Sequence, residues 1–415
     1  MTAEPLVLLA HRIPYPPDKG DKIRSYHLLR HLAGRYRVHL GAFVDDPADW
    51  GHAEALRQHC AGLCLRPLPP RRARLRALSG LATGQPLTLP YYRDGAMRRW
   101  VRRTLAATGA RRLVAFSAAM AQYADEAGPG CRRLLDLVDV DSDKWRQYGA
   151  RHRGPAGWVY RREARRLRAF ERRAAAAFDH TVLVSDAEAA LFRGLAPEAA
   201  DRIAAVENGV DTDRFHPGAD YPDPYPAGSQ PLVFTGAMDY WANVDAVSWF
   251  AESILPAIQT QRPEAVFYVV GARPVEAVRR LARLPGVVVT GRVPDTRPYL
   301  AHARLAVAPM RVARGIQNKV LEALAMARPV LATGPALDGL DVGGDYPLVA
   351  DAPEDLARLA TDWLAGSAGE ALGQRLCHWV RRRYEWDRQL DRLVQLLEGA
   401  PRAMPFVPDP QPVTR

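Results

Sequence analysis

The stretch APMRVARGIQNKVLEALAMARPVLAT, residues 308–333, indicates the fold of the protein. Its first residues predict a strand that ends near Met310, and its last residues, RPVLAT (328–333), predict a second strand. The segment between them predicts a helix that begins near Gln317. A strand, a helix and another strand in succession are typical of a parallel sheet with crossover helices.

The start of this helix gathers polar side chains that suit a phosphorylated ligand. They are Arg311, Arg314 and Gly315 in the loop, and Asn318, Lys319 and Glu322 in the first turns of the helix. Backbone N–H groups at a helix start and nearby cations bind phosphate, while a carboxylate suits sugar hydroxyls. In open parallel sheets such ligands lie past the carboxyl ends of the strands. The alternative is a purely structural helix with a solvated Glu322.

Outward from this segment, short β-branched runs alternate with helical stretches along the whole chain. We predict five strands in each half: 5–10, 37–43, 112–117, 133–139 and 180–185, then 231–236, 265–271, 286–291, 304–310 and 328–333. This pattern predicts two α/β units with parallel sheets. The predicted divisions are an N-terminal domain (1–212), a linker rich in Pro, Gly and Asp (213–230), a C-terminal domain (231–398) and a disordered tail (399–415). The alternative for the linker is a long surface loop inside one domain.

The composition is that of an ordinary globular protein of two domains, with 48% hydrophobic and 25% charged residues among 415. No apolar run is long enough to cross a bilayer. The short apolar run at the N-terminus predicts a first strand and not a signal peptide. The four cysteines stand too sparsely for a metal site, and we expect reduced thiols.

The net charge of +11 is unevenly divided. Residues 1–215 contain 36 basic and 24 acidic side chains, whereas the rest of the chain is close to neutral. Ten arginines fall in residues 144–178, where we predict a long basic helix from Trp158 onward. This helix is either a solvated face or a surface for anionic lipid, with Trp158, Tyr160 and Phe170 as interfacial anchors. Nucleic-acid binding is not expected, because no nucleic-acid-binding motif accompanies the charge.

Several motifs resemble, in chain order, the family-4 retaining glycosyltransferases. Those in the second half are ENGVD (207–211) followed by Phe215 and Pro217, FTGAMDYWANVDAVSWF (234–250) and VLEALAM (320–326); those in the first half are HRIPYPPDKGDKIRSYHLLRHLA (11–33) and VSDAEAALF (184–192). Glu322 matches the second Glu of the family's E-x7-E motif, whereas Arg314 stands at the place of the first. Gly236 is kept, but Met238 and Asn243 stand where the family usually places an Arg and a Lys on the diphosphate.

The combination is similar to the sugar transferases of bacterial PEP-CTERM/exosortase exopolysaccharide systems. The resemblance implies a GT-B fold, an α/β architecture of two Rossmann-like domains with parallel sheets that face across a cleft. It implies transfer of a hexosyl group from a nucleotide sugar, which is a substrate, without a metal or another cofactor. The implied acceptor is a glycan or a polyprenyl-diphosphate-linked sugar. We expect the protein in the cytoplasm at the inner face of the plasma membrane, because the charge excess of the N-terminal domain suits anionic lipid and the resembled transferases often act on lipid-linked acceptors.

The catalytic group is open between three candidates in the first half. His11 and Asp139 follow predicted strands, and Ser117 stands where many family members have a His. By the same resemblance, Gly20, Asp21 and Lys22 end the loop expected over the acceptor. The run DVDSD (139–143) could in principle hold a metal ion, but we expect none. Competing functions are a nucleotide-sugar epimerase and a non-catalytic scaffold for sugars or lipids, the latter suggested by the altered motif residues.

The altered diphosphate contacts lead to one more hypothesis. Two phosphates in a closed site need cationic compensation, because burying unpaired charge is costly. We therefore expect Arg314 and Lys319 on the phosphates, with Arg311 nearby. The alternative is that backbone N–H groups hold the diphosphate alone.

Overall fold

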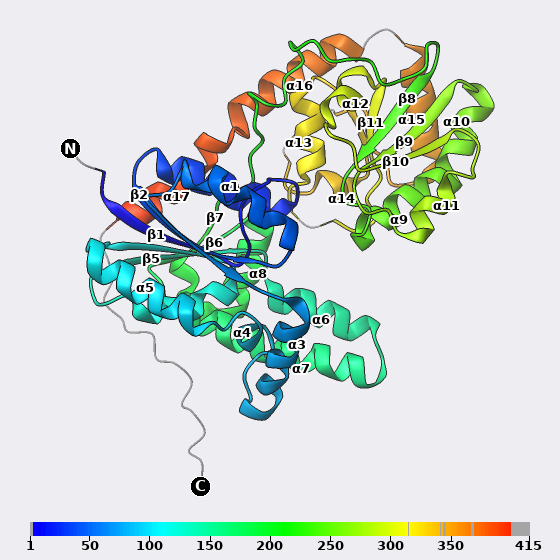
Figure 1. The fold of residues 1–415 in the computed structure, drawn as a ribbon. Coiled ribbons are helices and arrows are strands. Elements are labelled where there is room, and N and C mark those ends of the chain that lie inside the picture. The colour runs from blue at the N-terminus through cyan, green and yellow to red at the C-terminus, as the bar shows by residue number, and fades with distance from the viewer. Residues whose placement is uncertain (1–2, 314, 341, 343–345, 367–368, 400–415) are drawn as a thin grey trace. The chain divides into compact units, whose positions relative to one another are not determined.

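The computed structural model of the protein describes residues 3–313, 315–340, 342, 346–366 and 369–399. The chain forms two compact units (Figure 1). Unit 1 comprises residues 1–207 together with 390–415, and unit 2 comprises residues 208–389. No helix in the described part of the chain is both long enough and apolar enough to span a membrane.

Unit 1 is built on a seven-stranded sheet in the order β3-β2-β1-β4-β5-β6-β7, and all its pairings are parallel. The strands are β1 Pro5–Ala10, β2 Arg37–Val44, β3 Gly62–Pro67, β4 Arg112–Phe116, β5 Arg132–Val138, β6 His180–Leu183 and β7 Ile203–Ala205. Leu9 lies opposite Ala115 of β4 and Gly41 of β2, so the strand order reverses at β1. The carboxyl end of β1 is therefore the place where such sheets bind ligands.

Helices cover both faces of this sheet, with α1 on one face and α5 on the other (Figure 1). They are α1 Gly20–Ala33, α2 Ala53–Arg57, α3 Pro70–Thr83, α4 Thr88–Tyr91, α5 Gly95–Thr108, α6 Asp141–Arg151, α7 Gly154–Ala177 and α8 Asp186–Leu195, with the 3-10 turns η1 Pro47–His52, η2 Ala118–Glu126 and η3 Pro197–Arg202. The last helix, α17 Trp386–Glu398, belongs to unit 1 from Leu390 onward. Because both faces are covered, β1 is an almost continuous apolar run.

Unit 2 is built on a five-stranded parallel sheet in the order β10-β9-β8-β11-β12. Its strands are β8 Gln230–Thr235, β9 Ala265–Val270, β10 Val287–Gly291, β11 Leu305–Ala308 and β12 Val330–Ala332. Its helices are α9 Trp241–Trp249, η4 Phe250–Ile254, α10 Leu255–Gln261, α11 Glu276–Leu281, α12 Arg297–His302, α13 Asn318–Ala325, α14 Gly334–Leu337, α15 Pro353–Ala365 and α16 Gly369–Arg383. The order reverses at β8, so its carboxyl end is the equivalent ligand-binding position.

The two units bear out the predicted α/β class, and the ten predicted strands are present to within two residues at each end. The prediction of five strands in the first half is wrong, because unit 1 also contains β3 and β7. Strand β3 is a half-buried edge strand that ends in proline, and β7 has three residues. Neither therefore shows a buried apolar run.

The predicted linker, 213–230, lies within unit 2, and the chain passes into this unit after Glu207. Phe215 belongs to the core of unit 2. The Tyr225 ring lies 4.6 Å from that of Tyr268, and its hydroxyl donates to the Tyr299 carbonyl at 2.6 Å. Of the predicted tail, only Gly399 is among the described residues.

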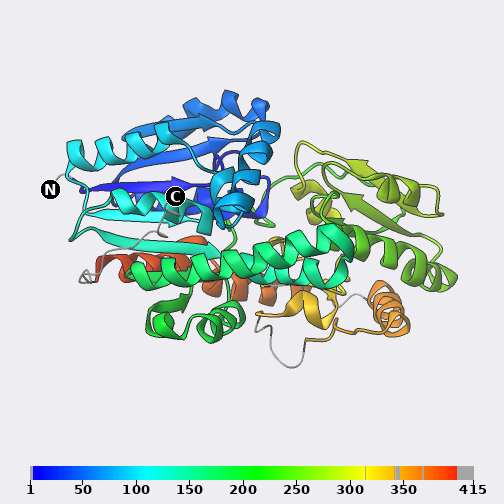
Figure 2. The same cartoon turned by 90° about the horizontal axis from the view of Figure 1, so that it is seen from below.

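The basic segment forms two packed helices, α6 and α7, and the second of them begins at Gly154 and not at Trp158 (Figure 2). The expectation that Phe170 anchors in lipid is wrong, because this ring is buried in the core of unit 1. Arg162 is also buried, and it donates to the Gly80 carbonyl at 2.6 Å and to the Gln85 carbonyl at 3.2 Å. At least one arginine of this segment therefore has a structural role, because it joins α7 to the end of α3 and the loop that follows.

Candidate functional site

The first group of candidate residues lies at the carboxyl edge of the unit 2 sheet. Strand β8 ends at Thr235, and Gly236 begins the loop that leads to α9. A Cβ atom on Gly236 would lie 2.8 Å from Asn243 Nδ2, and one on Gly271 would lie 1.7 Å from the Gly236 carbonyl oxygen. The loops after β8 and β9 therefore approach each other so closely that position 271 needs glycine, whereas Gly236 leaves room for the Asn243 side chain.

Helix α13 brings its two ionisable side chains to this edge. It buries Val320, Leu321 and Leu324 against the core, which leaves Lys319 and Glu322 half-buried at the surface of the unit. Gly315, at φ 61°, makes the left-handed turn before the helix. The sequence thus positions one cation and one carboxylate on consecutive turns of one helix.

Lys319 reaches across to α9. Its Nζ donates to Asn243 Oδ1 at 3.0 Å and lies 5.0 Å from the centre of the Phe234 ring. Asn243 is itself fixed, because its Nδ2 donates to the Ala237 carbonyl at 2.9 Å. Asn243 stands at the position where the resemblance leads one to expect a lysine, so the ammonium of Lys319 lies beside that position.

The electrostatics of Lys319 and Glu322 follow from their removal from water. Burial lowers the pKa of Lys319 to about 8, and the negative charge of Glu322 opposes this shift only in part. Burial raises the pKa of Glu322 to about 7, against the opposing charges of Arg214 and Lys319. Among the described residues, Glu322 has no hydrogen-bond partner, so its carboxylate is free to accept hydrogen bonds from a ligand.

The other residues expected at this site are placed less favourably. Arg311 forms a bidentate pair with Asp245 of α9 and lies over the Trp249 ring. Asn318 accepts a hydrogen bond from Asn208 at 3.3 Å. Arg314 lies outside the described residues. Of the three cations expected at this site, Lys319 is therefore the one in the described part of the chain that is not engaged in an ion pair.

In unit 1, the carboxyl end of β1 carries a polar cluster. His11 follows the strand directly, and its Nε2 lies 3.3 Å from Asp21 Oδ2. Arg12 donates to the same carboxylate at 2.7 Å and pairs with Asp45 at 3.0 Å. Although burial opposes it, the hydrogen bond from His11 and the charge of Arg12 hold the pKa of Asp21 below its usual range. Asp21 is thus an anion that orients both neighbours.

Two aromatic rings fix the orientation of the His11 imidazole. It stacks on the Phe116 ring with centroids 5.7 Å apart and planes at 8°, and the Tyr92 ring meets its edge. His11 Nδ1 is buried and has no partner among the described residues. His11 Nε2 faces Asp21. A role for His11 in proton transfer stays a prediction.

Ser117 and Asp139 are both engaged in local structure. Ser117 has φ 83°, and its hydroxyl caps η2 by accepting from the Ala119 amide at 3.3 Å. Asp139 accepts from Lys144 Nζ at 2.7 Å, and Asp141 accepts from it at 3.4 Å. Two carboxylates of DVDSD therefore pair with Lys144, and the third, Asp143, pairs with Arg146. The described residues contain no cluster of His, Cys, Asp or Glu suited to a metal ion.

The loop residues Gly20, Asp21 and Lys22 form the first turn of α1. Lys22 is 2% exposed and donates to Asp49 at 2.7 Å, so its charge is used inside unit 1. Sequence reasoning missed a second buried pair, in which Arg24 donates to Asp136 at 2.8 Å. The only signal for this pair in the sequence is an arginine at a buried position of α1.

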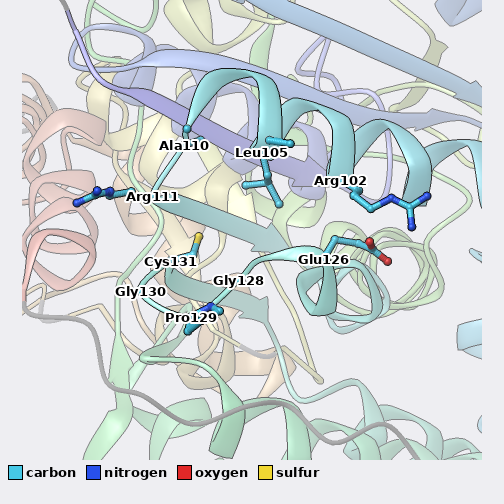
Figure 3. Close-up of a pocket in the computed structure, with 11 residues that line it drawn as sticks. Arg102, Leu105, Ala110, Arg111, Glu126, Gly128, Pro129, Gly130 and Cys131 are labelled. Carbon is cyan, nitrogen blue, oxygen red and sulfur yellow. The ribbon is translucent and has the colours of Figure 1, made fainter.

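A hollow of about 610 Å³ lies elsewhere in unit 1 (Figure 3). Its walls are the second half of α5, the turn 128–130, Arg111 and Cys131. These residues precede β4 and β5, so the hollow lies at the amino edge of the sheet, opposite the edge that carries His11 and Ser117. It is therefore separate from the candidate sites.

Comparisons with known proteins bear on the fold and on residues 229–365. Residues 229–365 match the family model of glycosyl transferases group 1. The fold is similar to that of sucrose-phosphate synthase from Thermosynechococcus elongatus, at 18% identity and a TM-score of 0.68, over 95% of this chain and 98% of that chain. WaaG, a glycosyltransferase involved in lipopolysaccharide biosynthesis, is 17% identical with a TM-score of 0.64, over 95% of this chain and 100% of its own.

A third similar structure is HepE of Anabaena in complex with UDP and glucose. It is 13% identical with a TM-score of 0.64, over 95% of this chain and 99% of that chain. No curated protein matches the sequence. The chain thus has the GT-B fold, and the part of it that carries Lys319 and Glu322 matches the group 1 glycosyl transferases.

Proposed function

We propose that the protein is a retaining, metal-independent glycosyltransferase that takes a hexosyl group from a nucleotide sugar. The acceptor is a glycan or a polyprenyl-diphosphate-linked sugar of exopolysaccharide biosynthesis in a bacterium. The reaction takes place in the cytoplasm, at the inner face of the plasma membrane. The comparisons support the transferase class and the fold, whereas the resemblance of the sequence motifs suggests the acceptor and the pathway.

One observation carries the proposal: at the carboxyl edge of the unit 2 sheet, Lys319 of α13 contacts Asn243, which lies beside Gly236, and Glu322 follows Lys319 one turn later on the same helix. The ammonium of Lys319 offers a positive charge to a diphosphate in a partly dehydrated position. One turn later, the unpartnered carboxylate of Glu322 can accept hydrogen bonds from ribose hydroxyls. The distance between consecutive turns, about 5.4 Å, suits the diphosphate and ribose of one nucleotide.

The position of Lys319 also supports a shift of the diphosphate cation within this site. The family usually places that cation at the start of the first helix of the C-terminal domain, where this chain has Asn243. Lys319 Nζ, 3.0 Å from the Asn243 amide oxygen, provides a cation beside the same place from another helix. Arg311 is bound to Asp245 and takes no direct part.

In the proposed reaction, the bond from the anomeric carbon to the diphosphate oxygen breaks, and a bond to the acceptor oxygen forms on the same face. The proton of the acceptor hydroxyl passes to the departing diphosphate. Lys319 stabilises the negative charge that develops there, and the two substrates need mainly to be positioned. In unit 1, His11, Ser117 and Asp139 remain the candidates near the acceptor, with Gly20, Asp21 and Lys22 in the adjoining loop.

The test begins with donor binding. Purified protein is heated with UDP-, GDP- and ADP-sugars, and a donor at about 100 times its dissociation constant should stabilise it by roughly 2.7 kcal/mol. The donor that binds is then labelled in its sugar and incubated with membrane lipid extract, with and without EDTA. Transfer that survives EDTA and retains the anomeric configuration supports the proposal. Donor binding without transfer would favour the scaffold, and an altered free nucleotide sugar would favour the epimerase.

A further inference from the structure

Helix α3 of unit 1 buries small side chains and exposes large apolar ones, the reverse of an ordinary surface helix. The face that packs on the protein consists of small residues, Ala73, Ala77 and Gly80. Its leucines point to solvent instead: Leu75 is 69% exposed, Leu78 55% and Leu81 40%. An amphipathic helix normally buries such residues, so this exposed stripe needs another explanation.

Arginines share the exposed face with these leucines. Arg71 stands four residues before Leu75, and Arg74 stands four residues before Leu78, which places each pair on one side of the helix. In the described structure neither arginine forms an ion pair. The sequence contains no Asp or Glu between Glu54 and Asp94, so no carboxylate from this stretch offsets their charge.

The helix is held firmly by its neighbour. Arg162 of α7 donates to the Gly80 carbonyl at 2.6 Å, and the guanidinium of Arg166 lies near Gly84, directly after α3. The exposed arginines of α7, among them Arg161 and Arg165, add further positive charge to this helix pair. The leucines are therefore presented by an ordered, positively charged support.

We propose that α3 inserts Leu75, Leu78 and Leu81 into the interface of an anionic lipid bilayer, with Arg71 and Arg74 on the lipid phosphates. Long arginine side chains can reach phosphate while leucines enter the acyl region. The inference does not depend on the proposed sugar transfer. On α7, where a membrane surface was also expected, Phe170 and Arg162 are buried, whereas Trp158 is 54% exposed.

The size and chemistry of the face favour lipid over other occupants. A helix of 14 residues is about 21 Å long. A stripe about 10 Å wide along it covers about 200 Å², far below the about 800 Å² per partner of a stable protein interface. Nucleic acid would use the arginines but would gain nothing from three leucines.

The experiment measures flotation of the full chain with vesicles of equal parts phosphatidylglycerol and phosphatidylcholine, and with pure phosphatidylcholine vesicles. We expect binding only to the anionic vesicles. L75S/L78S should weaken it by about tenfold or more, since exposed leucines that enter lipid lose their transfer free energy. R71Q/R74Q should weaken it by about 25-fold at low salt, from about fivefold for each arginine.

Two matched variants in unit 2 serve as controls. V275S/V349S removes two exposed apolar side chains, and R279Q/R280Q removes two exposed arginines; both should bind as the wild type does. Circular dichroism must show the same helix content for all variants. Unchanged vesicle binding of L75S/L78S, or equal binding of the wild type to neutral vesicles, would overturn the proposal. So would self-association of the wild type without vesicles that L75S/L78S abolishes, because the face would then join two copies.

Discussion

Replacing Lys319 with methionine tests the proposed donor site most directly. Methionine keeps an unbranched side chain of similar length, and the Phe234 ring beside it offers an apolar contact. Asn243 keeps its bond to the Ala237 carbonyl. The variant should therefore fold, and it removes a cation whose burial is already unfavourable, since the pKa of Lys319 is lowered to about 8.

The magnitude follows from the chemistry of one charged hydrogen bond. A hydrogen bond from an ammonium to phosphate contributes about 1.5–3 kcal/mol. Because each 1.4 kcal/mol is tenfold, affinity for the nucleoside diphosphate should fall by about one to two orders of magnitude. Affinity for the nucleoside without phosphates should change by less than about threefold, because Lys319 makes no contact with the base in the proposed arrangement.

The assay is calorimetric titration of the wild type and K319M with the nucleoside diphosphate and with the nucleoside. R279M, which loses an exposed arginine of α11, controls for the loss of one positive charge. The pH dependence gives a second readout. Lys319 loses its proton as pH rises through about 8, so diphosphate affinity of the wild type should fall there, whereas that of K319M should not. Equal losses for the diphosphate and the nucleoside in K319M would refute the reasoning.

Three further predictions follow from the same contacts. E322Q should lose most transfer activity, yet it should raise the melting temperature above that of the wild type, and by more at pH 8 than at pH 5. The pKa of Glu322 in the folded protein, about 7, lies above the usual 4.5, so the wild type loses the stability of the protonated acid as pH rises through 7. Equal melting shifts at both pH values would contradict this. R24M should destabilise unit 1 by about 3–5 kcal/mol in urea titration, because it removes the cation that compensates the fully buried Asp136 carboxylate. A loss below about 1 kcal/mol would show that the pair matters little. G271A should abolish donor binding or folding, because its Cβ would overlap the Gly236 carbonyl; wild-type donor affinity in thermal shift would show that the loops yield.

The sequence predicted the elements that are buried on both sides, and it failed where that signal is weak. Strand β1 is a continuous apolar run and was found with its bounds. Edge strand β3 is half-buried and contains Arg66, so it lacks such a run. The prediction for Phe170 was wrong because it used the residue type and not the helical spacing. Phe170 lies three residues after Leu167 and four before Ala174, on the buried face of α7.

The candidate donor site was predictable only in part. The spacing of Lys319 and Glu322 at one helix start is local, so the sequence shows it. The contact between Lys319 and Asn243 joins residues 76 positions apart and depends on how α13 packs beside α9. The pairing of Arg311 with Asp245 is also a tertiary contact, so sequence alone could not tell that this cation is already engaged.

The division of α17 between the units has a consequence for the biosynthesis of the protein. Its residues from Leu390 onward belong to unit 1, where Asp391 pairs with Arg35 at 2.6 Å and Glu398 accepts from Tyr36 at 2.8 Å. The Leu396 carbonyl accepts from Arg132 at 2.8 Å. Although residues 3–207 leave the ribosome before unit 2 does, they lack these partners until α17, which follows unit 2 in the sequence, has been made. A fragment that ends before Leu390 can therefore not form a complete unit 1, and unit 1 is completed only after all of unit 2 has been synthesised.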